Sequence, residues 1–386
     1  MKILIVGSGL MGPAAAYNAM SDPGVATVTL ADIDAAQLDA ARRKLAPLPG
    51  GDKIVTRQLD LSDRDAAITL FSGHDVILAA LPWSASRLAF DAAVHAGRPI
   101  VDLAIPEDEH LPELRRAAGE HGVLIALGCG LEPGLTEIMA RYLALRLDSV
   151  QELHIKCGGI PEAPSGPLGY KIVFGGRQLP LRDIDALVVE GGRPFMARRY
   201  SGHELTGFDG VGEVEGWHEG MMPWLLDLPE FAALTEGTQK TLRWPGYAAK
   251  ATVLLDLGLL GRTPVSVNGV DVIPKQLVDT LLYPSVELKD GEGDITLFRV
   301  EVIGMKDGVR TLHRADMVDR YDRALGFTSM ARTTAFTGAI VARMIGRGDI
   351  SATGLHYADG IVTAPLFELM MKELATAGVH FDITPA

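Results

Sequence analysis

The most constraining feature of the sequence is its start, where a short apolar run leads into a glycine-rich turn. Residues 2–6 indicate a buried strand, and the pattern Gly-x-Gly-x-x-Gly follows directly. Gly7 permits a tight turn, Gly9 lets the backbone approach a pyrophosphate, and Gly12 lets the next helix pack close to the strand. The N-terminus of that helix, expected near Pro13, would direct free N–H groups at the phosphates. We therefore predict a dinucleotide site formed by Gly7, Ser8, Gly9, Leu10, Met11 and Gly12.

The choice of cofactor depends on an acidic residue after the second apolar run. Residues 25–30 lead to Asp32, which lies about twenty residues beyond the last glycine, where a ribose-binding carboxylate is expected. An acid there accepts hydrogen bonds from both hydroxyls of the adenosine ribose and repels a 2′-phosphate. The sequence therefore predicts NAD rather than NADP. In the alternative interpretation, Asp32 or Asp34 only caps the helix expected over 35–45.

Along the first third of the chain, short apolar runs alternate with helix-like segments. The runs are continuous, as in parallel strands that are covered on both faces. This alternation predicts an α/β fold with a doubly wound parallel sheet, a Rossmann fold of six strands. The further strands are expected at 54–59, 76–80, 99–102 and 123–126, and the further helices at 62–71, 84–96 and 109–121.

Ligands of doubly wound sheets bind beyond the carboxyl ends of the strands. Topology therefore brings Asp60, the run Ala80-Leu81-Pro82 and Asp102 to the predicted cleft. Asp60 would suit the adenine amino group, or it caps the helix expected to begin at Ser62. Asp102 would suit a substrate ammonium, or it only caps a turn.

The pattern changes after residues 128–134, where a second α+β domain is expected. We predict domains at 1–130, 131–328 and 329–386, the last consisting of helices that pack back on the first domain or on a subunit interface. The segment 202–223 is expected to be a long irregular loop, which in compact enzymes is often a lid or a substrate loop. The expected elements are helices at 135–147, 329–346 and 364–377, strands at 152–156, 186–189, 252–257, 265–267 and 296–302, turns at 267–269 and 306–308, and a loop at 161–169.

Composition limits the partners. A length of 386 residues suggests two domains, and a net charge of −13 argues against nucleic acid or an acidic membrane as partner. Cys129 and Cys157 are the two cysteines, and their spacing indicates neither a disulfide framework nor a metal site. No stretch is apolar enough to span a bilayer. We therefore expect a soluble cytoplasmic protein that acts on a small molecule.

Four further motifs carry a resemblance to a known family. They are Leu131-Glu132-Pro133-Gly134, a Gly-Gly-Ile-Pro turn at 158–161, Met-Ala-Arg-Thr-Thr-Ala at 330–335 and Met-Ile-Gly-Arg-Gly at 344–348. Over nearly its whole length, the chain resembles the saccharopine dehydrogenase (saccharopine reductase) family, and within it the lysine 6-dehydrogenases most. The resemblance implies a Rossmann domain with an α/β substrate domain, a homodimer or higher oligomer, and NAD-linked oxidative deamination or the reversal of a reductive condensation.

The resemblance also implies substrate residues. Asp102 and the turn containing Leu131 and Glu132 match positions that contact substrate between the domains of saccharopine reductases. Glu215, with an aromatic residue and His218 after it, matches a Glu-x-aromatic-His run of lysine 6-dehydrogenases. The following run, 219–224, is bulkier and less polar than in those enzymes. It predicts that an apolar or bulkier amine is used better than lysine.

Amine oxidation requires a neutral nitrogen, so a base must accept an ammonium proton. A histidine suits this role by its pKa, and His218 is the best candidate; Asp102 is the best carboxylate to hold an ammonium. Tyr170 and the pair Arg198-Arg199 could bind a substrate carboxylate, with Arg199 preferred. In the alternative interpretation, His218 is a surface residue of an acidic loop and the arginine pair is a solvated face.

Three functions are compatible with these features. The first is an NAD-dependent amino-acid or amine dehydrogenase that forms an imine. The second is a saccharopine- or opine-type enzyme acting on a secondary amine, which a second arginine-rich carboxylate site would favour. The third is a non-catalytic NAD-binding protein, because an intact glycine turn argues for binding only.

Overall fold

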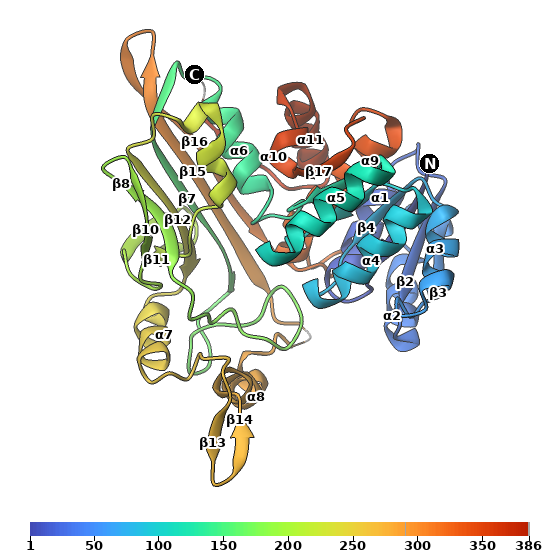
Figure 1. The fold of residues 1–386 in the computed structure, drawn as a ribbon, viewed down its shortest axis with the longest axis horizontal. Helices are drawn as coiled ribbons and strands as arrows, with labels where there is room; N and C mark the ends of the chain where they lie inside the picture. The colour runs from blue at the N-terminus through green and yellow to red at the C-terminus, as the bar shows by residue number, and fades with distance from the viewer. Residues whose placement is uncertain (290, 385–386) are drawn as a thin grey trace. The chain divides into compact units, whose positions relative to one another are not determined.

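The computed structural model describes residues 1–289 and 291–384. They form two compact units (Figure 1). The first unit is Met1–Ile138 with Ala331–His380, and the second is Met139–Met330, which the chain rejoins from Phe381.

A seven-stranded parallel sheet forms the centre of the first unit. Its strand order is β17-β6-β5-β4-β1-β2-β3, so the order reverses between β1 and β4. The six predicted strands are confirmed, and β17 is a seventh that the sequence analysis missed. The bounds are β1 (Lys2–Val6), β2 (Thr27–Asp32), β3 (Ile54–Gln58), β4 (Val76–Ala79), β5 (Ile100–Asp102), β6 (Leu124–Leu127) and β17 (Gly354–Tyr357).

Helices connect these strands and cover the sheet. The predicted helix rich in small residues is α9, and Gly338 shows how it packs: a Cβ there would lie 2.3 Å from Cδ2 of Leu103 and 3.2 Å from the carbonyl oxygen of Cys129. α9 therefore lies against the loops that follow β5 and β6. The helices are α1 (Met11–Met20), α2 (Ala35–Leu45), α3 (Arg64–Ser72), α4 (Trp83–Ala96), α5 (Leu111–His121), α9 (Ser329–Arg347), α10 (Ala358–Ile361) and α11 (Ala364–Thr376).

The second unit is built on a nine-stranded sheet. Along the chain, α6 (Leu135–Ala144) follows β6 of the first sheet and precedes β7, the first strand of the second sheet. The order is β10-β11-β12-β7-β15-β16-β18, and β8 pairs with both β12 and β9. β12 runs parallel to β7, while the other pairings are antiparallel. The bounds are β7 (Ser149–Pro161), β8 (Ala186–Glu190), β9 (Arg193–Ala197), β10 (Glu204–Phe208), β11 (Gly212–His218), β12 (Glu236–Arg243), β15 (Asp294–Lys306), β16 (Val309–Arg320) and β18 (Asp382–Ile383).

Three predictions for this unit are wrong. The segment 202–223 is not an irregular loop, because it contains β10 and β11. The segment 252–257 is not a strand, because it forms the end of α7 (Tyr247–Asp256), whose Tyr247, Ala248 and Ala251 are buried. The Gly-Gly-Ile-Pro motif is not a turn either, since it ends the long strand β7.

The remaining elements are a hairpin, a helix and short 3-10 turns. β13 (Val265–Val267) and β14 (Val270–Val272) form the hairpin, and α8 (Pro274–Val286) follows. Residues with positive φ make both predicted turns, Asn268-Gly269 and Asp307-Gly308. The 3-10 turns are η1 (Gly51–Lys53), η2 (Asp108–His110), η3 (Pro223–Asp227) and η4 (Pro229–Phe231). Within the described ranges, none of the helices combines the length and apolarity that a membrane span needs.

The packing of α9 gives a stability prediction. Gly338→Ala should lower the free energy of unfolding by about 1–3 kcal/mol, because the new methyl group overlaps Leu103. Gly119→Ala in α5 is the matched control: no atom lies within 4 Å of its Cβ position, so alanine should stabilise the helix by about 0.5–1 kcal/mol. Urea unfolding of both variants measures the difference, and equal effects would contradict the packing of α9.

Candidate functional site

The glycine turn contains two glycines that packing requires and one that it does not. A Cβ on Gly7, whose φ is +100°, would lie 2.3 Å from the carbonyl oxygen of Ala80, and one on Gly12 would lie 1.9 Å from the carbonyl oxygen of Gly7. A Cβ on Gly9 would meet only Oε1 of Gln37, at 3.9 Å. Gly9 is exposed and borders open space, which we call the recess at Gly9; a side chain there would enter this space, and the fold itself does not require a glycine at this position.

Donors surround this recess. α1 begins at Met11 after Leu10, and no side chain in the described part of the chain caps it or places an acid in its first turn. The Ser8 hydroxyl is buried and has no hydrogen-bond partner among the described residues. Free N–H groups at a helix N-terminus with an adjacent hydroxyl suit a pyrophosphate. The predicted residues Gly7 to Gly12 thus fit a dinucleotide.

Asp32 ends β2 beside this turn. Its Oδ2 accepts a hydrogen bond from the Ser8 N–H at 2.5 Å, and its Oδ1 accepts one from the Asp34 N–H at 2.9 Å. Asp34 in turn caps α2 by accepting from the N–H groups of Ala36 and Gln37. The capping role therefore falls to Asp34, and Asp32 joins the end of β2 to the glycine turn.

The other predicted cofactor residues lie at neighbouring strand ends. Asp60 accepts a hydrogen bond from the Ser62 N–H but does not cap α3, which Asp63 caps. The Ala80 N–H donates to the Val6 carbonyl, Leu81 lies next to Gly7, and Pro82 precedes α4. Ala80, Leu81 and Pro82 therefore follow β4, beside β1 where the strand order reverses and dinucleotides bind, whereas Asp60 follows β3 at the end of the strand order.

Asp102 ends β5 and is enclosed in the first unit. Its Oδ1 accepts from the Ala104 N–H at 2.9 Å, whereas its Oδ2 is buried without a hydrogen-bond partner in the described chain. Burial raises the pKa of this carboxyl to about 7, against the lowering effects of Ala104 and Ser86. In register, Asp102 lies beside Ala79, next to the reversal of the strand order. The raised pKa makes Asp102 a candidate proton acceptor near neutral pH.

The turn after β6 holds the next predicted pair. Leu131 is buried and its carbonyl accepts from both the N–H and the hydroxyl of Thr136, while Glu132 is partly exposed. Glu137 supports the turn by accepting from the Gly134 N–H at 2.6 Å. Leu131 thus packs inside the turn, and Glu132 carries a more accessible carboxylate than the buried Glu137.

The second unit brings together four large side chains that we call the donor cluster: Tyr170, Trp217, Arg243 and Tyr247. The rings of Trp217 and Tyr247 stack with centroids 5.1 Å apart, and Tyr170 meets Tyr247 edge-on at 5.6 Å. The Arg243 guanidinium lies 4.6 Å from the centre of the Tyr170 ring. All four side chains are at least nine-tenths buried. Of these four residues, only Tyr170 and Trp217, the aromatic residue of the 215–218 run, belong to motifs that the sequence singles out.

The polar atoms of the donor cluster are mostly unsatisfied. Among the described residues, the hydroxyls of Tyr170 and Tyr247, Nε1 of Trp217 and Nε of Arg243 have no hydrogen-bond partner of ordinary geometry. Arg243 forms no ion pair within the described ranges; its Nη1 donates to the Leu242 carbonyl at 2.8 Å. Burial raises the pKa of both phenols, so they stay neutral donors. The cluster therefore offers several N–H and O–H donors around one buried positive charge.

Glycine in β7 makes room for this charge. A Cβ on Gly158 would lie 2.3 Å from the Leu242 carbonyl oxygen and 3.0 Å from Nη1 of Arg243. Glu215 lies opposite Arg243 on β11, but its carboxylate accepts from the N–H groups of Gly246 and Ala248 at the start of α7. Glu215 therefore holds α7 and Tyr247 in place, a role that its sequence pattern did not indicate.

Because side chains alternate along β11, the residues of the run 215–218 point to two opposite faces of the sheet. Glu215 and Trp217 point to the face of the donor cluster, so His218 points to the opposite face, where it pairs in register with Lys240. Burial and then the charge of Lys240 lower the pKa of His218. Its expected place in an irregular loop is therefore wrong, and its role as a base stays a prediction.

Two other predicted substrate residues have close partners within the second unit. Arg199 is buried and engaged: Nη1 pairs with Glu219 at 2.6 Å and Nη2 donates to the Glu219 carbonyl, so it is not free to hold a carboxylate. Met221, expected in a substrate wall, packs beneath Gly237 at the other end of β12, about 20 Å along the strand from Arg243. The preference for an apolar or bulkier amine, which was inferred from 219–224, stays a prediction.

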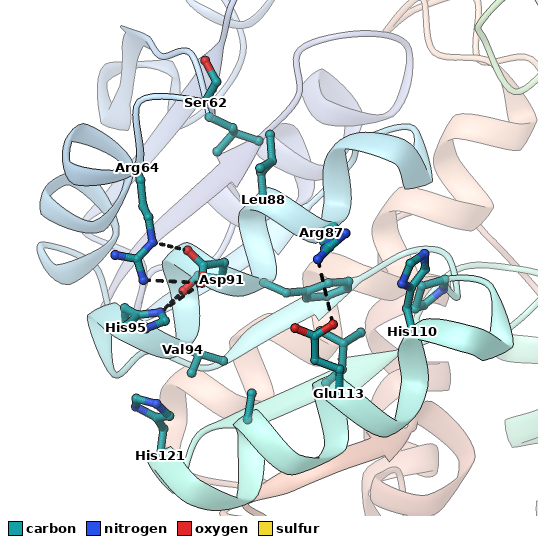
Figure 2. A pocket seen from close by; sticks show the side chains of 15 residues that line it. Ser62, Arg64, Arg87, Leu88, Asp91, Val94, His95, His110, Glu113 and His121 are labelled. Carbon is teal, nitrogen blue, oxygen red and sulfur yellow. Dashed lines mark hydrogen bonds and ion pairs between the residues drawn. The ribbon is translucent and has the colours of Figure 1, made fainter.

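A cavity of about 430 Å³ lies apart from these residues, between α3, α4 and α5 (Figure 2). Its charged groups pair with one another: Arg64 with Asp91 at 2.6 Å, and Arg87 with Glu113 at 3.9 Å. The lining contains none of the predicted site residues. Over the described ranges, no group of three or more His, Cys, Asp or Glu side chains is arranged to hold a metal ion.

Fold and site define a two-unit protein with a Rossmann-type dinucleotide domain and a second, mixed-sheet domain. The family model described as the saccharopine dehydrogenase NADP binding domain matches residues 3–125, and that of the saccharopine dehydrogenase C-terminal domain matches residues 130–379. The chain belongs to the saccharopine dehydrogenase family.

Individual relatives are distant. Saccharopine dehydrogenase [NADP(+), L-glutamate-forming] of Schizosaccharomyces pombe is 24% identical over 290 residues, which is 68% of this chain and 59% of that one. Carboxyaminopropylagmatine dehydrogenase of Synechocystis is 22% identical over 333 residues, 80% of this chain and 78% of that one. The chain spans about three-fifths of the length of the Schizosaccharomyces pombe enzyme that it matches.

A solved structure has the same fold over the whole chain. The apo saccharopine dehydrogenase (L-Glu forming) of Saccharomyces cerevisiae superposes with a TM-score of 0.79, covers 100% of both chains and is 18% identical. At that identity, the match shows the fold alone.

The recess at Gly9 gives a prediction with an internal control. Gly9→Ala should leave the unfolding temperature nearly unchanged but weaken dinucleotide binding at least tenfold, because its methyl group enters the recess. Gly12→Ala should instead destabilise the protein by about 1–3 kcal/mol, because its methyl group overlaps the Gly7 carbonyl. Thermal unfolding and NADH fluorescence titration measure both effects. Undiminished NADH binding by Gly9→Ala would refute this cofactor site.

Proposed function

We propose that this chain is an NAD-dependent oxidoreductase that acts on the amino group of a substrate bearing a carboxylate, such as lysine or a related amino acid. The observation that carries the proposal is the donor cluster, where Arg243 is buried without an ion-pair partner in the described chain and is surrounded by unsatisfied donors. A buried guanidinium without a counter-charge is costly, and a bound carboxylate would remove that cost.

Different residues would hold the substrate carboxylate and the dinucleotide. Arg243, Tyr170 and Tyr247 would hold the carboxylate, and the glycine turn with Asp32 would hold the dinucleotide. When bound, the nicotinamide would accept a hydride from the carbon that bears the nitrogen. A base of the chain must first take the ammonium proton, because only the neutral amine can release that hydride and become an imine.

The proposed binding of a carboxylate by Arg243 can be tested by comparing how its substitution changes KM and how it changes the unfolding temperature. Arg243→Met should raise KM for an amino-acid substrate, with a loss in kcat/KM of about 10- to 150-fold, as expected for a charge-assisted hydrogen bond of roughly 1.5–3 kcal/mol. The unfolding temperature should stay the same or rise, because a buried charge is replaced by an apolar side chain. Arg198→Met, at an exposed arginine of the same unit, is the control. An unchanged KM in Arg243→Met would refute the carboxylate site.

The preference for NAD rests on Asp32, the carboxylate at the end of β2. The matching family model is described as NADP-binding, so this preference needs its own measurement. The unmodified protein should bind NADH more tightly than NADPH, and Asp32→Asn should reduce that preference about tenfold by removing repulsion of the 2′-phosphate. Asp34→Asn, which changes the α2 cap, is the control. Tighter binding of NADPH by the unmodified protein would overturn the choice of NAD.

Two groups are candidates for the base. Asp102 has a pKa of about 7 and an unpartnered Oδ2, but it is enclosed; His218 is partly exposed and has a lowered pKa. We favour Asp102. Because a base works only when deprotonated, kcat/KM should rise with pH through about 7 and then level off. Asp102→Asn should abolish this rise and lower turnover by about two to four orders of magnitude, whereas His218→Ala should retain it. The opposite pattern would assign the base to His218.

A second candidate function is a saccharopine- or opine-type dehydrogenase that acts on a secondary amine. The names of the relatives favour it: saccharopine dehydrogenase and carboxyaminopropylagmatine dehydrogenase. A non-catalytic NAD-binding protein is the third candidate.

One screen separates these functions: NADH formation by the purified protein with amino acids, diamines and carboxylate-bearing secondary amines. A primary amine should release ammonia, whereas a secondary amine releases an amino compound and an oxo compound. The absence of turnover across the panel would favour the non-catalytic protein.

A further inference from the structure

The cavity of about 430 Å³ between α3, α4 and α5 has the size of a small-molecule site (Figure 2). Its inner wall is apolar and either belongs to the hydrophobic core of the first unit or packs against it. The residues of this apolar wall are Leu61, Phe90, Val94, Leu114 and Ala117. The cavity therefore suits a ligand that has an apolar part.

One side of the cavity carries an ion pair that is already satisfied. The Arg64 guanidinium donates to the Asp91 carboxylate through Nε at 2.6 Å and through Nη2 at 3.5 Å. Nδ1 of His95 lies 3.3 Å from the same carboxylate, and the His95 ring lies 5.2 Å from that of His121. Because each charge on this side has a near partner in the chain, a ligand would gain little from it.

The other side of the cavity carries a cation and an anion that are open to a ligand, Arg87 of α4 and Glu113 of α5 (Figure 2). Their charged groups approach only to 3.9 Å, between Nη2 and Oε2, which is too long for a hydrogen bond. Both side chains are exposed, at 63% and 60%. An exposed pair at this distance contributes little stability, so exchanging it for closer partners costs little.

The position of these two charges selects the charge pattern of a ligand. A carboxylate alone could approach Arg87 but would also meet the like charge of Glu113, and an amine alone would meet Arg87 in the same way. A ligand with a carboxylate and an ammonium on one carbon places an opposite charge beside each side chain. A third substituent on that carbon can then lie against the apolar wall.

We propose that this cavity binds a free α-amino acid with a large apolar or aromatic side chain. Its carboxylate would pair with Arg87 and its ammonium with Glu113, so that close charge-assisted hydrogen bonds replace one long contact. Its side chain would displace water from the apolar wall. The donor cluster belongs to the second unit, so this site is independent of the proposed substrate site.

Calorimetric titration of the full chain with L-phenylalanine tests the charge pattern. The titration uses the Arg243→Met variant without dinucleotide, so that the proposed substrate site does not contribute. L-Phenylalanine should bind with one-to-one stoichiometry and at least tenfold more tightly than phenethylamine or 3-phenylpropanoate, each of which lacks one of the two charges. Equal binding of the three compounds, or no binding of L-phenylalanine, would overturn the proposal.

Variants in the same background locate the site. Arg87→Ala and Glu113→Ala should each weaken the binding of L-phenylalanine at least tenfold and leave the unfolding temperature nearly unchanged, because both side chains are exposed. Glu113→Ala should also bind 3-phenylpropanoate more tightly than its parent, because the like charge is gone. Arg116→Ala, at an exposed arginine of α5 that pairs with Glu120, is the matched control. Unchanged binding of L-phenylalanine by Arg87→Ala and Glu113→Ala would place it elsewhere and refute this site.

Discussion

The close contact between Gly7 and Gly12 is the constraint on which the first unit depends. The Gly7 carbonyl oxygen occupies the position where a side chain on Gly12 would begin, and the Ala80 carbonyl does the same for Gly7. Only hydrogen at both positions lets α1 start directly over the ends of β1 and β4. The N-terminus of α1, Ser8 and Asp32 then all lie beside the recess at Gly9.

In the second unit, a glycine again makes room for a neighbouring group, which here is an arginine side chain. Gly158 in β7 has no side chain, so the Leu242 backbone and the Arg243 guanidinium can lie against it. Glu215 satisfies the start of α7 and thereby fixes Tyr247 over Trp217. The result is a positive charge that is buried without an ion-pair partner in the described chain, an arrangement that a bound anionic group would stabilise.

The first unit was predictable because each of its decisive signals is local. Apolar runs give parallel strands, and spacing places Asp32 after the glycines. The missed strand β17 is short and contains His356, so it lacks the apolar pattern of the other strands. In the second unit, β10 and β11 escaped prediction because Gly207, Gly212 and Gly216 interrupt them, although residues 212–218 do alternate.

The donor cluster could not be predicted as a unit from the sequence. Its members come from a loop, two strands and a helix, and only the pairing of β11 with β12 brings Trp217 near Arg243. The sequence of β12, which is polar along most of its length, gave no signal that Arg243 would be buried. His218 and Arg199 were predicted from the chemistry of their side chains. Strand alternation places His218 on the face of the sheet opposite the donor cluster, and Arg199 pairs with Glu219.

The central claim is that Arg243 recognises a substrate carboxylate. The most direct measurement compares kcat/KM for an amino-acid substrate and for the same amine without its carboxylate, in the unmodified protein and in Arg243→Met. If Arg243 binds the carboxylate, the unmodified protein should prefer the carboxylate-bearing substrate by about 10- to 150-fold, and this preference should nearly disappear in the variant. A preference of the same size in both proteins would contradict the account.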